Sequence, residues 1–147
     1  MKLNDEDILY FLRNGRLKAI AYRAEKKNIV DTFGTPDYES DIKFNFQRID
    51  YNGIQFYFES EELVNIQIYP CEDWVWNHAL TIDNALNILN NHQIEFAEIQ
   101  SEVDFFRNFK TSSRVEMYFT NQDDEKTWLL HCFGKSIETK FNESMNQ

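Results

Sequence analysis

The pattern of hydrophobic and polar positions predicts two helices at the start of the chain. The first has a helical stripe formed by Ile8, Leu9, Phe11 and Leu12. Asn4, followed by three acidic residues, is typical of a helix start, and Gly15 of a helix end. A second helix is expected over about residues 25–32. It should end near Gly34, because Pro36 pushes the residue before it out of helical geometry.

Three strands are predicted next, as an antiparallel meander. Apolar residues alternate with polar ones at Ile42, Phe44 and Phe46, at Ile54, Phe56 and Phe58, and at Val64, Ile66 and Ile68. Asn52-Gly53 predicts a tight hairpin turn, since both residues tolerate a positive φ. Such alternation is typical of a sheet with one buried face.

The same order of elements is predicted again after a connector over residues 71–80. Thr81 should cap a helix that buries Ile82, Ala85, Leu86 and Leu89. Residues 94–99 are ambiguous, like residues 17–24 in the first half. Ser101 is expected to cap a further helix carrying Phe105, Phe106 and Phe109. A hairpin then pairs residues 115–119 with residues 128–133.

Two offsets suggest an internal repeat. Ile29, Val30 and Phe33 recur as Phe105, Phe106 and Phe109, 76 positions later, and residues 54–58 recur as residues 115–119, 61 positions later. Chance similarity of amphipathic elements is the alternative. The predicted fold is a single α+β domain over residues 1–147, a tandem repeat of two helices followed by antiparallel strands (about 5–70 and 81–133). The repeats would share one sheet with the helices packed on one face. The polar tail, residues 138–147, is expected to fray.

The solvent-facing side of this sheet is the candidate binding surface. It would carry Gln55, Tyr57, Asn65, Gln67, Tyr69, Glu116, Tyr118 and His131. Tyrosines among polar residues suit protein binding, and Tyr57, Tyr69 and Tyr118 are the candidate anchors. The alternative is an ordinary solvated sheet face, since tyrosine also favours strands.

Acidic residues are concentrated at two predicted hairpin turns. The first turn carries Glu59, Glu61 and Glu62, and the second carries Asp123, Asp124 and Glu125. If the repeats share one sheet, both turns could lie along a common edge and attract a basic partner. Alternatively, they only promote solubility.

The composition narrows the range of partners. The formal net charge of −10 disfavours nucleic acid and anionic membranes and favours a basic protein partner. No apolar run has the length of a membrane span, and the first residues lack the apolar stretch of a secretion signal. A cytoplasmic location is expected.

Residues with catalytic or metal-binding potential are few. His78, His92 and His131 occur in no recognisable motif, and the neighbours His131 and Cys132 should point to opposite faces of a strand. No metal-ligand spacing or phosphate-binding loop occurs, so neither catalysis nor a cofactor is expected. Cys71 and Cys132 could pair, or remain separate buried thiols. Trp74 and Trp76 in the connector are either a lid over the core or anchors for a partner.

The segments FGTPD, YNGIQFYF and LVNIQIYP, with the helices before them, resemble small bacterial proteins that occur as immunity proteins of polymorphic toxin systems. The doubled arrangement is similar to the β-lactamase-inhibitory-protein-like fold. The chain departs from secreted members of that fold in lacking an export signal and paired cysteines. The resemblance implies a non-catalytic immunity protein that neutralises a basic toxin domain by occlusion. The alternative is a small-ligand-binding or regulatory domain.

Overall fold

The computed structural model describes residues 3–17, 19–121 and 127–137. Within these ranges the chain forms three helices and one antiparallel sheet of eight strands, which confirms the α+β class. The helices are α1 (Asp5–Asn14), α2 (Lys26–Phe33) and α3 (Ile82–Asn91). The strands are β1 (Tyr38–Glu39), β2 (Phe46–Tyr51), β3 (Ile54–Glu59), β4 (Glu62–Ile68), β5 (Phe96–Ile99), β6 (Phe106–Thr111), β7 (Glu116–Thr120) and β8 (Leu129–Ser136). The predicted tail lies outside the described residues.

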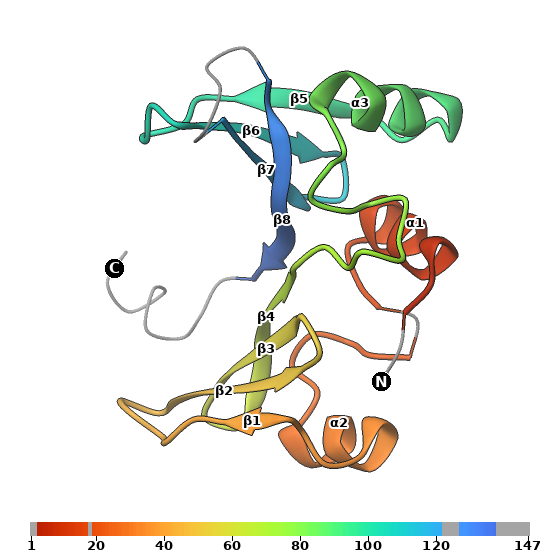
Figure 1. The fold of residues 1–147 in the computed structure, drawn as a ribbon. Coiled ribbons are helices and arrows are strands. Elements are labelled where there is room, and N and C mark those ends of the chain that lie inside the picture. The colour runs from red at the N-terminus through yellow and green to blue at the C-terminus, as the bar shows by residue number, and fades with distance from the viewer. Residues whose placement is uncertain (1–2, 18, 122–126, 138–147) are drawn as a thin grey trace.

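The strands follow the order β1-β2-β3-β4-β8-β7-β6-β5 across the sheet (Figure 1). The four strands from the first half of the chain therefore lie next to one another in one half of the sheet, and the four strands from the second half form the other half. The halves meet where β4 pairs with β8. In Figure 1 the three helices lie to the right of these two central strands.

The two halves pair their strands in closely similar ways. The β3–β4 register shifts between Tyr57 and Phe58, and the β7–β8 register shifts between Tyr118 and Phe119, 61 positions later. β2 and β6, which precede these strands, show the same order of buried and half-buried residues. The segments 54–58 and 115–119 thus occupy corresponding places, each in the middle of a meander with its bulge at the same point.

The helix predicted after Ser101 is wrong. Phe106 and Phe109 lie in β6, where Phe109 is buried opposite Met117 and Phe106 faces the other side of the sheet. The Ser101 hydroxyl bonds to the backbone of Val103 and caps no helix. The match of these phenylalanines with α2 is therefore wrong as well. The ambiguous residues 94–99 contain β5, so the second half has four strands, as the first does, and among the described residues it has one helix.

The first predicted strand begins later than its pattern indicated. Ile42 and Phe44, expected on the buried face, are 62% and 94% exposed, and β2 starts at Phe46. The hairpin at Asn52-Gly53 is confirmed, with φ of 40° and 91° at its two turn residues. Since β2, β3 and β4 pair in succession, the predicted meander is present with a shifted first strand.

The helix ends follow the signals in the sequence. Asn4 and Asp7 bond each other's backbone in a reciprocal cap at the start of α1, and Gly15 ends the helix with φ of 75°. Thr81 accepts a hydrogen bond from the Asn84 backbone at the start of α3. Gly34 ends α2 with φ of 87°. These side chains and glycines satisfy backbone groups that a helix end leaves unpaired.

One hydrophobic core contains residues of all three helices and of the sheet. It includes Phe11 of α1, Ile29 of α2, Leu89 of α3, and alternate residues of the central strands. Trp74 and Trp76 in the connector are 8% and 1% exposed, which confirms that they cover the core. Cys71 and Cys132 are free thiols, so the pairing considered from the sequence is absent.

α1 connects the two halves through backbone contacts. The Ser113 hydroxyl, in the β6–β7 turn, donates to the Leu12 carbonyl at 2.7 Å, and Arg13 donates to the His92 carbonyl at 2.9 Å. At the other end of α1, Asp5 accepts the Val75 backbone N–H at 2.9 Å. α1 therefore fixes the first half against both the connector and the second half.

Candidate functional site

The side of the sheet opposite the core presents a continuous surface, which we call the polar face. The strand registers place the predicted tyrosines and glutamines on it together with residues that sequence reasoning missed. Its members include Arg48, Asp50, Gln55, Tyr57, Asn65, Gln67, Tyr69, Phe106, Asn108, Lys110, Glu116, Tyr118, His131 and Cys132. Both halves of the chain contribute to it.

The two tyrosine side chains at corresponding registers are held in the same way. Tyr57 donates to Gln55 at 2.6 Å, and Tyr118 donates to Glu116 at 2.5 Å. Burial raises the pKa of the Tyr118 hydroxyl, and the hydrogen bond to Glu116 raises it further. Each ring is therefore fixed before any partner arrives, which lowers the entropy cost of binding.

His131 lies near the centre of the polar face. Its ring packs edge-on against Tyr69, at 6.0 Å between centroids, and in a tilted arrangement against Phe106, at 5.5 Å. Burial lowers the pKa of His131, and the nearby His78 lowers it further. The imidazole is thereby favoured in its neutral form among aromatic rings.

His131 and Cys132 lie on the same side of the sheet, so the prediction of opposite faces is wrong. The bulge in the β7–β8 pair leaves His131 as the extra residue of β8, because Tyr118 pairs with Cys132 and Phe119 pairs with Leu130. A bulge breaks the alternation of side chains along a strand. Burial raises the pKa of the Cys132 thiol to about 12, which makes it a poor nucleophile.

The charges of the polar face are matched in pairs. Arg48 contacts Asp50 at 3.0 Å, and Lys110 contacts Glu116 at 3.3 Å. Burial raises the pKa of Asp50 even though Arg48 acts in the opposite direction. The centre of the candidate surface is thus close to neutral.

The strand ends that border the two predicted acidic turns do not share an edge of the sheet. Because β4 and β8 run antiparallel, the turn before β4 and the ends of β7 and β8 that flank the second turn lie at opposite ends of the sheet. Glu59 is only 4% exposed, Glu62 forms an ion pair with Arg23 at 3.6 Å, and Glu61 is exposed. The other three predicted residues, Asp123, Asp124 and Glu125, lie outside the described residues.

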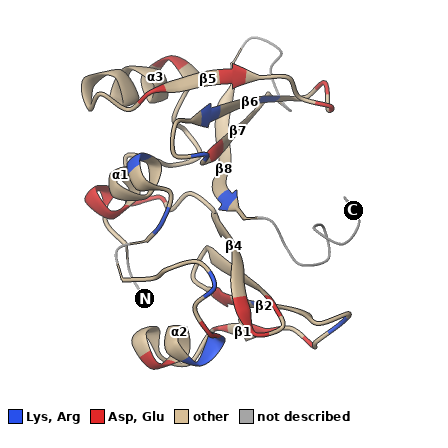
Figure 2. Ribbon diagram, turned by 180° about the vertical axis from the view of Figure 1, so that it is seen from behind, with Lys and Arg blue, Asp and Glu red and all other residues tan. Residues whose placement is uncertain are grey.

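Acidic residues are spread over the described molecule. They occur on all three helices and on strands of both halves (Figure 2). The excess of negative charge therefore acts as a general field around the protein and is not a property of one flank. Such a field still accelerates the approach of a basic partner.

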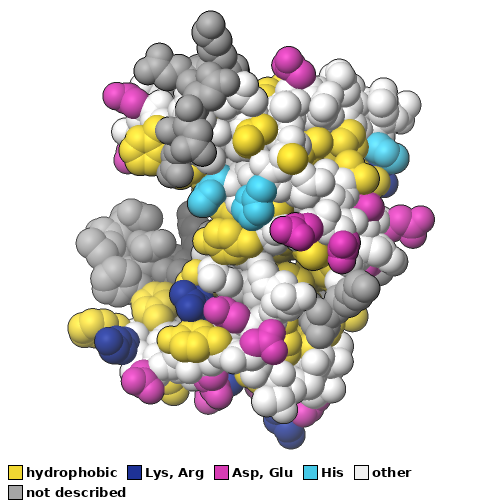
Figure 3. Space-filling view, viewed as in Figure 1, with side chains coloured by type: hydrophobic (Ala, Val, Ile, Leu, Met, Phe, Trp, Pro, Cys, Tyr) yellow, Lys and Arg dark blue, Asp and Glu magenta, His cyan; other side chains and the backbone are white. Residues whose placement is uncertain are grey.

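Exposed apolar side chains mark two hairpins. Ile42 and Phe44 precede β2, and Val103 and Phe105, at 38% and 50% exposure, precede β6. In Figure 3 hydrophobic side chains project at the left edge of the upper and lower halves, with histidine side chains between them. The sequence contained a signal for this: Asp41-Ile42-Lys43-Phe44 and Glu102-Val103-Asp104-Phe105 lie 61 positions apart.

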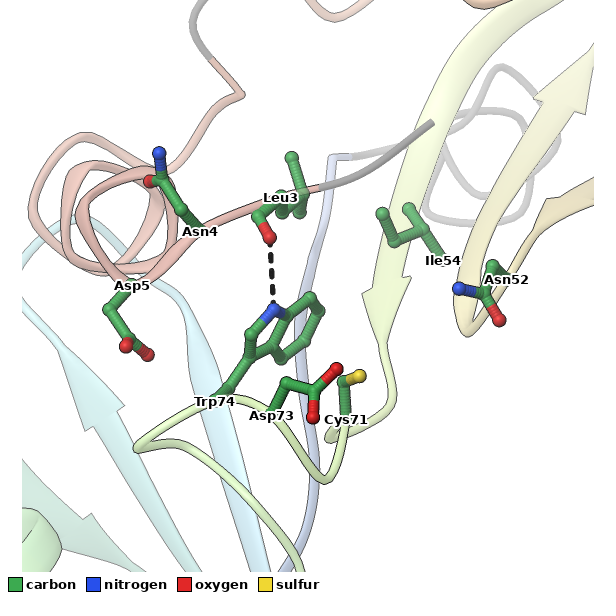
Figure 4. A pocket seen from close by; sticks show the side chains of 8 residues that line it. All are labelled: Leu3, Asn4, Asp5, Asn52, Ile54, Cys71, Asp73 and Trp74. Carbon is green, nitrogen blue, oxygen red and sulfur yellow. Dashed lines mark hydrogen bonds between the residues drawn. The ribbon is translucent and has the colours of Figure 1, made fainter.

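A pocket of about 550 Å³ lies beside the start of α1 (Figure 4). It is lined by Leu3, Asn4, Asp5, Asn52, Ile54, Cys71, Asp73 and Trp74. The Trp74 indole N–H donates to the Leu3 carbonyl at 3.0 Å. Asn4 is engaged in the helix cap, and Asp5 in the bond from Val75. The pocket has the size of a small-molecule site, but two of its polar groups already serve the fold.

The three histidines lie in three different surroundings. His78 lies in the connector, 3.3 Å from the Leu130 carbonyl, and His92 caps the end of α3. No cluster of His, Cys, Asp and Glu suited to a metal ion occurs in the described part of the chain. Among the same residues, no helix has the length and apolar character needed to cross a membrane.

Comparison with known proteins gave no relative. No protein-family model, curated protein or solved structure matches the chain. The polar face and its geometry are therefore the basis for the function proposed below.

Proposed function

We propose that the protein is a non-catalytic, cytoplasmic protein-binding module, and that the polar face is its docking surface. The proposed biological role is that of an immunity protein, which neutralises a basic toxin domain by covering it. The observation that carries the proposal is the pair Tyr57 and Tyr118. Each tyrosine is fixed by a hydrogen bond at a corresponding register of a sheet face that spans both halves.

The chemistry of the face supports this proposal. Rigid tyrosines surrounded by amides offer a large contact area at a low entropy cost. The internal ion pairs leave the centre of the face nearly neutral, so a partner need not desolvate an unpaired charge there.

The proposed architecture is a tandem duplication whose helices pack on one face of the shared sheet. The bulges at corresponding points of the two halves support it. So does the pairing of Gln67 with Gly134 where β4 meets β8, because residues 67 positions apart hold corresponding places in these two strands. In such an arrangement α2 and α3 correspond, and α1 is an addition that joins the halves. The polar face would then be the side that no helix covers.

The test is affinity capture from the host that encodes the protein, followed by titration of the purified partner. Replacing both Tyr57 and Tyr118 by alanine should weaken binding by at least about tenfold, since anchor side chains of this kind often contribute more than 1 kcal/mol each. Tyr10 on α1 provides a matched control, and Y10A should retain affinity. Equal affinity of the double variant and the wild-type protein would reject the polar face as the docking surface.

A second candidate function is small-ligand binding in the pocket beside α1, which its volume of about 550 Å³ favours. The Trp74 side chain lines this pocket, and its indole N–H signal in the NMR spectrum is assigned by its loss in W74F. A ligand of the pocket should shift this signal in a saturable way, whereas the indole N–H signal of Trp128, which does not line the pocket, should stay unchanged. A broad metabolite screen without such a shift would exclude this function.

A further inference from the structure

A phenylalanine stands at the tip of the hairpin that leads into β2. Lys43 and Phe46 exchange backbone hydrogen bonds of 2.9 and 2.8 Å, so Phe44 and Asn45 form a two-residue turn. Both turn residues have positive φ, 52° and 68°. The Phe44 side chain is 94% exposed and adds nothing to the core.

This residue choice is unfavourable for folding. A two-residue turn of this kind suits asparagine and glycine, whereas an aromatic residue at positive φ costs about 1 kcal/mol. The next hairpin of the same chain uses Asn52-Gly53 at the corresponding turn positions. A residue that is costly for the fold and exposed to solvent points to a role outside the fold.

A second tip repeats the exposure of apolar side chains but not the positive φ, which residues 103–105 do not have. Val103 and Phe105 are exposed before β6, 61 positions after Ile42 and Phe44. The same offset relates the bulges of β3 and β7. In Figure 1 the β1–β2 and β5–β6 connections project to the left, away from the helices, at the lower and upper ends of the molecule.

Both tips continue into the polar face. The centroid of the Phe105 ring lies 5.0 Å from that of the Phe106 ring, and the Phe106 ring in turn packs against His131. Beside the first tip, a hollow of about 370 Å³ is lined by residues that include Lys43, Arg48 and Tyr57. The tips and the polar face thus form one surface, with exposed phenylalanines at its two ends.

We infer that Phe44 and Phe105 are paired anchors that insert into two apolar clefts of one basic protein. The inference rests on the proposed docking function of the polar face and adds the anchor residues to it. Glu102 and Asp104 are exposed in the second tip, whereas in the first tip the exposed Asp41 is balanced by the exposed Lys43. The carboxylates of the second tip would meet lysine or arginine around its cleft, in agreement with the net charge of −10.

The same charge argues against other occupants. A second copy of the chain would bring the acidic second tip against another protein of charge −10, and nucleic acid would be repelled as well. Two linked anchors also bind more tightly than either alone, because the second insertion is intramolecular. A basic protein with two clefts is therefore the partner that the surface fits.

Site-specific photo-crosslinking tests the inference. The photoreactive residue p-benzoyl-phenylalanine is placed at position 44, at position 105, or at the exposed Asn90 of α3 as a control. Each protein is irradiated in an extract of the host, and the adducts are identified. The same basic protein should be captured from positions 44 and 105 but not from position 90. No shared adduct, or a shared adduct that is acidic, would overturn the inference.

The captured protein, once purified, is then titrated against point variants. F44A and F105A should each weaken binding by at least about tenfold. Val75, in the connector, is 50% exposed like Phe105, and V75A should bind as the wild-type protein does. F44N keeps a favourable turn residue, so its loss of affinity cannot be assigned to misfolding.

The titration also separates this inference from the proposed function. If the Tyr57 and Tyr118 replacements weaken binding while F44A and F105A do not, the polar face is the docking surface and the anchors are refuted. If the phenylalanine variants lose affinity and the tyrosine variants do not, the tips bind the partner without the polar face.

Discussion

Gln67 of β4 lies directly opposite Gly134 of β8, and the Gln67 amide occupies the space that a Cβ at position 134 would need. The two halves of the chain meet at this pair. Glycine is required here by the close approach of a side chain, and not by a positive φ. The contact also aligns Gln67 to donate to Asn65 at 2.7 Å on the polar face.

Replacing Gly134 by alanine should destabilise the protein by about 1 kcal/mol, because Gln67 must move and lose its bond to Asn65. In a Q67A background the same replacement should cost little. Urea denaturation of the four proteins gives the coupling energy directly. An equal cost of G134A in both backgrounds would show that the Gln67 contact is not its cause.

Gly15 is sensitive for a different reason. It ends α1 with φ of 75°, and a Cβ there would lie 2.8 Å from the Ser113 carbonyl oxygen. G15A should therefore cost about 2–3 kcal/mol from backbone strain plus overlap. Asparagine tolerates this φ but carries the same Cβ, so G15N should remain destabilising. If G15N is as stable as the wild-type protein in urea denaturation, the overlap with the β6–β7 turn is not significant.

Trp76 should contribute more to stability than any exposed connector residue. The residue is 1% exposed, and its indole packs against the Phe133 ring with 6.3 Å between the ring centroids. W76A should lower the free energy of unfolding by about 3–5 kcal/mol, the usual cost of removing a buried aromatic residue. The neighbouring V75A should change it by less than about 0.5 kcal/mol. A thermal melt of W76A close to that of V75A would contradict the lid role.

His131 should make stability depend on pH. Its pKa in the folded protein lies below the unfolded value of about 6.5, so the unfolded state binds more protons near that pH. Stability should be full above about pH 6.5 and should decrease as the pH falls toward the folded pKa. H131Q should flatten this part of the profile when unfolding is measured by urea at several pH values. An unchanged slope would assign the effect to another group.

Phe44 should be replaceable with a gain in stability. F44N relieves the positive φ of an exposed aromatic residue and loses no core contact, so the free energy of unfolding should rise by about 0.5–1 kcal/mol. Alanine lacks the local side-chain hydrogen bonds by which asparagine tolerates this φ, so F44A should gain less. A loss of stability in F44N would mean that the ring supports the fold, which would remove the argument for an anchor.

The sequence was sufficient for elements whose signals are local. The cap at Asn4, the helix end at Gly15, the Asn52-Gly53 turn and the α3 start at Thr81 depend on residues within one turn of each other. Alternation likewise predicted β3 and β4, with Tyr57 on the exposed side. Such features need no information from distant parts of the chain.

The sequence failed where distant contacts decide the structure. Phe105, Phe106 and Phe109 fit a helical stripe, yet β6 forms because its neighbours β5 and β7 offer hydrogen bonds along both edges. The burial of Glu59 and the shared side of His131 and Cys132 also depend on strand pairing and a bulge.

For this protein, then, the sequence alone determined the α+β class, the helix caps, the turn chemistry and the tyrosines of the candidate face. The tertiary structure alone decided the eight-strand order, the opposite placement of the strand ends that border the two predicted acidic turns, and the projection of Phe44 and Phe105 from both ends of one surface. The reason is physical. Helix caps and tight turns are stabilised within a few residues, whereas the partners and direction of a strand are fixed only when β4 meets β8 across the sheet.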